Sequence, residues 1–161
     1  MRSSSISSPT STPPSAPSPP ESSAAWLATL QSPELQSPAL HSKLGPLQLA
    51  WLGDAVWELH QRLRHCRQPG RSAELHRAVV AEVRADAQAA ALDRLEQRGL
   101  LTDEELELVR KGRNRAGRGP RRGESGIYGR ATGFETMVGW LFLRNPSRLA
   151  QLLDRLEDAD P

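Results

Sequence analysis

The sequence predicts an all-α protein, with a single helical domain that follows a disordered N-terminal tail. Apolar residues recur at intervals of three and four through most of the chain after residue 44, which is the helical period. The β-branched residues are few and never alternate with polar ones over a useful length, so no strand is expected. We therefore divide the 161 residues into a tail (1–25), a short connecting segment (26–43) and one helical domain (44–158).

The tail is predicted to be disordered because of its composition. Its 25 residues include ten serines and six prolines, which cannot build a hydrophobic core. A transit peptide is the alternative, since the segment is rich in serine and poor in acids. The arginines and the amphipathic period of such a peptide are missing, however, and disorder is the preferred interpretation.

Two features that the sequence lacks limit the cellular compartments in which we expect the protein. No apolar run approaches the roughly 20 residues that a membrane-spanning helix needs. Cys66 is the only cysteine, so no intrachain disulfide can form, and the four histidines do not complete a zinc-ligand spacing with it. We expect a cytoplasmic protein with no membrane association and no structural zinc.

The first long helix is expected from Pro46 to about His65. Proline is favoured at the first position of a helix, and Gly45 precedes it. The buried face of this helix is expected to consist of Leu49, Leu52, Val56, Leu59 and Leu63.

A second helix is predicted from an N-cap at Ser72 to about Gln97, with Gly99 as its stop. Thr102 and Glu105 form a capping box that begins a third helix, which extends to about Lys111.

The stretch from Gly112 to Gly129 has no period and is rich in glycine, so it is predicted to be a long loop. Helical spacing resumes around Thr132 and continues through Phe142. A last helix follows Asn145-Pro146, and its apolar face comprises Leu149, Leu152, Leu153 and Leu156.

Two acids stand out in otherwise apolar helices. Asp54 is surrounded by Leu, Gly, Ala, Val and Trp, and Glu135 lies in a similar apolar stretch. A buried carboxylate without a partner costs several kcal/mol, so each acid needs a cation or a cleft. Two such carboxylates suggest a site for Mg²⁺, which prefers oxygen ligands. In the alternative, each acid pairs with an arginine.

Positive charge is concentrated between residues 110 and 130. Eight basic residues and one acid give this segment a net charge of +7, so the remainder of the chain carries −5 within a total of +2. Almost all of this charge is arginine, whose guanidinium matches phosphate oxygens in pairs. The segment therefore predicts a polyanionic partner, although a charge run can also be a solvated loop.

Several motifs together carry a family resemblance. The segment Leu52-Gly53-Asp54-Ala55-Val56 resembles the signature helix of the ribonuclease III catalytic domain, and Phe134-Glu135-Thr136-Met137-Val138-Gly139 resembles its second acidic helix. Further motifs resemble the smaller Mini-ribonuclease III family, which lacks a separate double-stranded-RNA-binding domain; they are Leu75-His76, Ala85-Asp86-Ala87-Gln88-Ala89, Leu101-Thr102-Asp103-Glu104-Glu105 and Arg110-Lys111-Gly112-Arg113-Asn114.

The resemblance implies that residues 44–158 form the catalytic domain of an endoribonuclease. Such an enzyme is a homodimer that hydrolyses phosphodiester bonds in double-stranded RNA with Mg²⁺, and its family role is maturation of the ends of precursor large-subunit (23S-type) ribosomal RNA. Ribosomal proteins are then expected as further partners. Asp54 and Glu135 match the catalytic and metal-binding acids of the family.

The basic segment is then expected to bind the RNA. The candidate residues are Arg110, Lys111, Arg113, Asn114, Arg115, Arg118, Arg121, Arg122, Tyr128 and Arg130. Full-length ribonuclease III has two further acids, at the places that Ala50 and Thr132 occupy here. Mini-ribonuclease III proteins lack both of them too, so the departure agrees with the smaller family, and two tightly bound metal ions are not implied.

Two alternatives to an enzyme follow from the same features. The first is a catalytically silent ribonuclease III-like scaffold that binds RNA in ribosome assembly, and the second is a helical adaptor for a protein partner. The retention of both Asp54 and Glu135 favours the enzyme. Trp51, Trp57 and Trp140 are expected in the core or at the dimer interface.

Overall fold

A computed structural model describes residues 27, 37–117 and 125–158. Within these residues all regular secondary structure is helical and no strand is present, so the prediction of an all-α fold is confirmed. The helices are α2 (Pro38–His41), α3 (Pro46–His65), α4 (Ser72–Val83), α5 (Ala85–Gln97), α6 (Asp103–Arg115), α7 (Ser125–Arg144) and α8 (Pro146–Glu157). The predicted disordered tail lies outside the described residues. None of the described helices combines the length and apolarity that a membrane span requires.

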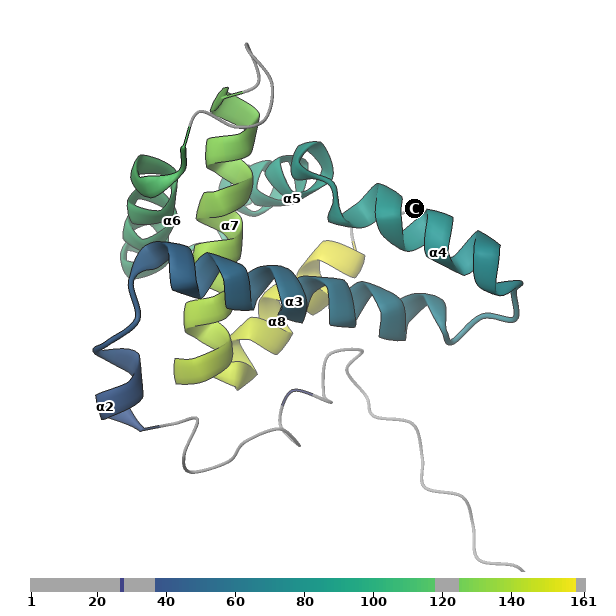
Figure 1. Ribbon diagram of the computed structural model, residues 1–161, viewed down its shortest axis with the longest axis horizontal. Helices are drawn as coiled ribbons and strands as arrows, with labels where there is room; N and C mark the ends of the chain where they lie inside the picture. The colour runs from purple at the N-terminus through teal and green to yellow at the C-terminus, as the bar shows by residue number, and fades with distance from the viewer. Residues whose placement is uncertain (1–26, 28–36, 118–124, 159–161) are drawn as a thin grey trace, which may run out of the picture.

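Helix α7 is the centre of the domain. It packs against α3, α5, α6 and α8, and α3 crosses it at a steep angle (Figure 1). Its sequence is apolar on all sides rather than on one stripe, as expected of a helix that is covered by neighbours. Every other helix of the domain is therefore positioned, directly or through one neighbour, by its contact with α7.

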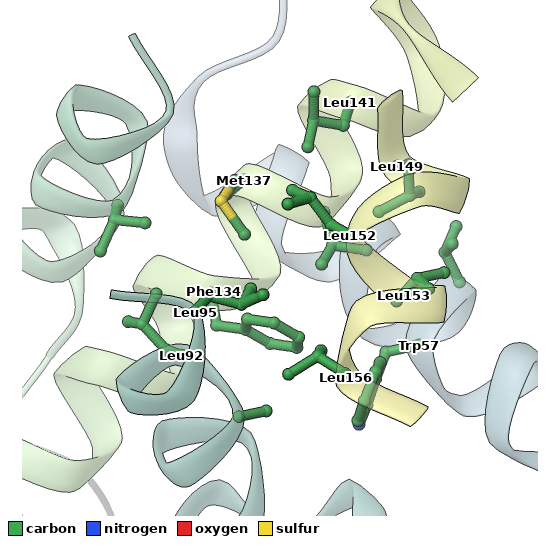
Figure 2. Close-up of a cluster of buried hydrophobic side chains, with 14 of the residues drawn as sticks. Trp57, Leu92, Leu95, Phe134, Met137, Leu141, Leu149, Leu152, Leu153 and Leu156 are labelled. Atoms are coloured by element: carbon green, nitrogen blue, oxygen red, sulfur yellow. The ribbon is translucent and has the colours of Figure 1, made fainter. Parts of the chain in front are cut away.

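The hydrophobic core lies between α7, α8, α5 and α3 (Figure 2). The Trp57 ring of α3 meets the Phe134 ring of α7 edge to face, with centroids 5.1 Å apart at 89°. The four leucines predicted for the apolar face of α8 are all buried against this cluster. Burial of a leucine stabilises a fold by about 1.5–3 kcal/mol, so α8 is firmly attached to the domain.

Glycines allow α3 and α7 to touch through their backbones. A side chain at Gly53 would overlap the carbonyl oxygen of Glu135 and would lie 2.8 Å from the backbone nitrogen of Gly139. A side chain at Gly139 would in turn overlap the carbonyl oxygen of Leu49. The two helices cross at these two glycines because no larger residue permits such a close approach.

The prediction of a single helix from Ser72 to Gln97 is wrong, because the structure has two helices there, α4 and α5. Arg84 separates them with an extended backbone (φ −69°, ψ 153°). The break frees the carbonyl oxygen of Glu82, which accepts a hydrogen bond from Trp57 Nε1 at 3.1 Å. Ser72 is the first residue of α4 rather than its N-cap. The stop at Gly99 is confirmed, with φ of +60°.

The loop predicted from Gly112 to Gly129 is shorter in the structure. Helix α6 continues to Arg115, and α7 begins at Ser125 rather than near Thr132. Gly112 does not end its helix. It allows α6 to approach α7, since a side chain there would overlap the hydroxyl of Thr136.

The predicted buried face of α3 is correct only in part. Leu49 and Val56 are buried, whereas Leu59 and Leu63 are 41% and 38% exposed. Trp57 belongs to the core, but Trp51 is 81% exposed and does not. No described residue of a single chain thus covers this apolar face of α3.

The predicted capping box at the start of α6 is confirmed. The Thr102 hydroxyl accepts a hydrogen bond from Glu105 N, and Thr102 N donates to the Glu105 carboxylate at 2.8 Å. The same carboxylate accepts from Arg148 Nε at 2.8 Å, and Arg148 also donates to the carbonyl oxygen of Leu100. This paired carboxylate, whose pKa is lowered, fastens α8 to α6.

Candidate active site

The crossing of α3 and α7 brings Asp54 and Glu135 into one site. Asp54 follows Gly53 directly, and Gly53 lies against the backbone of Glu135 itself. The carboxylates are close enough that the charge of Asp54 raises the pKa of Glu135. Two acids that are far apart in the sequence are therefore neighbours because two glycines let their helices touch.

Burial and neighbouring negative charges disfavour the charged forms of both acids. The pKa of Glu135 rises from 4.5 to about 7, chiefly because the side chain is buried and secondly because Asp54 is negative. The pKa of Asp54, whose carboxyl is only partly desolvated, is raised first by that desolvation and then by the charge of Glu58. Such a pair of carboxylates, held together against repulsion, is suited to a cation.

No protein cation neutralises this pair within the described residues. Neither Asp54 nor Glu135 forms an ion pair with an arginine, lysine or histidine there. The alternative of two separate acid–arginine pairs thus has no support in these residues. Glu58, which stands four residues after Asp54, pairs instead with Arg62, whose Nε is 3.0 Å from Glu58 Oε1.

The donor set fits a hard divalent ion that keeps much of its water. Within the described residues, no group of three or more His, Cys, Asp or Glu side chains is arranged to enclose a metal. A site with two carboxylates would hold Mg²⁺ through one or two protein oxygens and several waters, which is how this ion is commonly bound. Asp54 is exposed to solvent, so such an ion would remain open to a substrate.

Gln88 of α5 is a third polar residue at this site, and no role was predicted for it from the sequence. Burial raises the pKa of Asp54 and of Glu135, and the nearby Gln88 amide partly offsets this rise at both carboxylates. The sequence does contain a feature that could have singled out Gln88. Gln88 occupies a core position of α5, in line with Ala91, Leu92 and Leu95, where an apolar residue is expected.

The predicted RNA-binding residues differ in their environment. Arg113, Asn114 and Arg115 are exposed at the end of α6, and Tyr128 is 37% exposed near the start of α7. Arg110 and Lys111 both form ion pairs with Glu107, at 2.6 Å and 3.9 Å.

Arg130 is held by two acids of α5, Glu96 at 2.6 Å and Asp93. These ion pairs fasten the start of α7 to α5 and raise the pKa of Arg130. Three of the predicted residues lie outside the described part of the chain, namely Arg118, Arg121 and Arg122.

The raised pKa of Glu135 predicts that the metal-free protein becomes less stable as the pH rises. Because Glu135 binds its proton more tightly in the folded state, its ionisation lowers the free energy of unfolding as the pH rises from 4.5 through 7. At pH 8 the cost is about 3 kcal/mol. In EDTA at pH 8, Glu135→Gln should therefore melt at a higher temperature than the wild type, and the difference should shrink at pH 5. A less stable variant at pH 8 would contradict this account of the site.

Comparisons with known proteins agree with the fold and identify the family of the chain. Residues 47–146 match the Ribonuclease III domain family. The chain is 51% identical over 120 residues to a Mini-ribonuclease 3 of Synechococcus, an alignment that covers 74% of this chain and 86% of that protein. It is 44% identical over 138 residues to a Mini-ribonuclease 3 of Synechocystis, covering 84% and 93%.

A more distant relative and a solved structure extend the same result. A Mini-ribonuclease 3 of Symbiobacterium thermophilum is 42% identical over 118 residues, covering 71% of this chain and 89% of the relative. The crystal structure of a Fusobacterium nucleatum protein has the same fold, with a TM-score of 0.66 at 23% identity over 74% of this chain and 96% of that one. The resemblance found in the sequence is confirmed: the chain belongs to the Mini-ribonuclease III branch of the ribonuclease III family and is an endoribonuclease.

Proposed function

We propose that this endoribonuclease cleaves double-stranded RNA with Mg²⁺ held by Asp54 and Glu135. One observation carries the proposal, which is that α3 and α7 hold two carboxylates together without a protein cation among the described residues. A cleavage assay on a labelled RNA duplex tests it, with Mg²⁺ or with EDTA. We expect cleavage in Mg²⁺ and no cleavage in EDTA. Binding without cleavage in both conditions would favour the silent scaffold.

The two acids have different parts in this chemistry. Asp54 is exposed to solvent, whereas Glu135 is largely buried. We therefore assign the side that faces the phosphate to Asp54. When bound, Mg²⁺ supplies charge neutralisation at the phosphate and activation of a water. Asp54 and Glu135 position the ion, so neither carboxylate is required as the general base. No covalent nucleophile is invoked.

We assign the RNA contact to the basic segment that joins α6 to α7. A-form RNA offers phosphates and 2′-hydroxyls across a shallow groove, so an arginine-rich surface on the helix that leads into α7 and Glu135 is suited to it. Arg113, Asn114, Arg115 and Tyr128 extend from the helices that flank residues 118–124. The physiological substrate that we propose is precursor 23S-type ribosomal RNA, with ribosomal proteins as neighbours on that substrate, and the enzyme acts in the cytoplasm.

Loss of exposed arginines should weaken RNA binding in a salt-dependent way. For Arg113→Ala with Arg115→Ala, we expect weaker duplex binding, and the slope of log affinity against log salt should fall by about 1 for each phosphate that is no longer neutralised. Fluorescence anisotropy in EDTA over a salt series measures both. Arg98→Ala is the matched control, because Arg98 is exposed but donates to the Arg155 carbonyl oxygen on α8. Equal slopes in all proteins would remove Arg113 and Arg115 from the interface.

We further propose that two chains pair through the uncovered face of α3. Leu47 and Trp51 are 52% and 81% exposed, and Ala55 continues the same face beside Asp54. An exposed apolar face of this kind favours association with a matching surface.

The oligomeric state of a charged variant tests this pairing. Trp51→Glu places a charge on the paired face and should yield a monomer in light scattering coupled to gel filtration. The wild type should have the mass of two chains. A wild-type protein that is monomeric at micromolar concentration would overturn the pairing while leaving the metal site untouched.

A further inference from the structure

Gln88 is a buried polar residue of α5 that lies near the two acids of the site. Its side chain is 2% exposed. Within residues 27, 37–117 and 125–158, Nε2 forms no hydrogen bond of ordinary geometry. Buried polar groups are nearly always paired, and an apolar side chain at this position of α5 would avoid the cost of burying an amide. The fold alone therefore gives no reason for a glutamine here.

The surroundings of Gln88 supply such a reason. The residue is on α5, which packs against α7. Its amide is near enough to the carboxylates of Asp54 on α3 and Glu135 on α7 to lower the pKa of each, against the larger effect of burial, which raises it. The amide nitrogen has two N–H groups, and an ionised carboxylate is purely an acceptor. One residue can thus serve both acids, with one N–H directed toward each.

We propose that Gln88 is a positioning residue whose amide orients the carboxylates of Asp54 and Glu135 toward a shared divalent ion. This inference rests on the proposed function. Residues behind a metal ligand fix its direction, and their loss commonly weakens metal binding 10- to 100-fold. Here the amide also restrains two acids that repel each other, and it does so from a third helix, so the site depends on α5 as well as on the crossing of α3 with α7.

The alternative is that Gln88 merely fills space in the core. In that case, an apolar residue of similar size would serve equally well and the metal affinity would not change. Gln61 offers a matched control in the same protein. It is 1% exposed on α3, and its amide oxygen accepts from Arg64 Nη1 at 3.4 Å, away from the two acids.

The test is a calorimetric titration of Mn²⁺ into the full-length, metal-free protein. We expect Gln88→Met and Gln88→Leu to bind Mn²⁺ about 10- to 100-fold more weakly than the wild type, with an unchanged number of ions per chain. Gln61→Met should bind as the wild type does. Duplex binding in EDTA should be unaffected in all four proteins, because Gln88 acts on the acids and not on the RNA.

The outcomes separate this inference from the proposed function. A folded Gln88→Met protein with wild-type Mn²⁺ affinity would overturn the role of Gln88 alone. If both apolar variants unfold by circular dichroism while Gln61→Met folds, the amide is a requirement of the fold, and the positioning role is likewise rejected. A wild-type protein that binds no Mn²⁺ would instead overturn the proposed function.

Discussion

Replacement of Asp54 by asparagine should abolish cleavage while leaving the fold and the RNA affinity intact. The change removes the exposed negative charge that we assign to the metal ion. Stabilisation by a catalytic metal amounts to several kcal/mol, so the rate on a duplex should fall by about 10³-fold or more. Single-turnover cleavage with Mg²⁺ measures the loss, and anisotropy in EDTA measures the affinity.

A matched control separates this effect from a general loss of charge. Asp103 begins α6 in an exposed position, so Asp103→Asn makes the same chemical change outside the site and should cleave at the wild-type rate. Undiminished cleavage by Asp54→Asn would show that the chemistry has been assigned to the wrong residue.

Substitution of the glycines at the crossing of α3 and α7 should have the largest effect on the fold. A methyl group at Gly53 meets the backbone of Glu135, which cannot move aside as a flexible side chain would. Overpacking typically costs about 1–3 kcal/mol, and a clash with backbone atoms belongs to the upper end of this range. Gly53→Ala and Gly139→Ala should therefore unfold at lower urea concentration and lose cleavage, because the two acids are separated.

The control for these two glycine variants is Gly126, which lies at the start of α7. A side chain at Gly126 would meet no atom within 4 Å, so Gly126→Ala should stabilise α7 by up to about 1 kcal/mol. If Gly53→Ala and Gly139→Ala instead unfolded at the wild-type midpoint with normal cleavage, the close crossing would not be what assembles the site.

The sequence predicts most of the helices because their signals are local. The apolar period of α8, the capping box at Thr102 and the stop at Gly99 each depend on a few neighbouring residues, and each is confirmed. Asp54 and Glu135 stand out for a similar reason, since a single acid in an apolar helix is visible without a structure. Their convergence is not visible, because it depends on a contact between distant segments.

The errors arise where tertiary contacts override local signals. The break at Arg84 contains neither glycine nor proline, and the carbonyl that it frees is satisfied by Trp57 from another helix. Gly112 has the local appearance of a stop, yet it lies inside α6 because α7 approaches there. Gln88 stands out as a polar residue at a core position of α5, but its nearness to the two acids depends on contacts between distant segments.

The most direct test of the metal site is a Mn²⁺ titration of metal-free wild type, Asp54→Asn and Glu135→Gln by calorimetry. The shared site predicts saturable binding by the wild type and its loss in both variants, since each removes one of the two carboxylates that hold the ion. Binding of equal strength in all three proteins would contradict the claim that Asp54 and Glu135 together hold the catalytic metal.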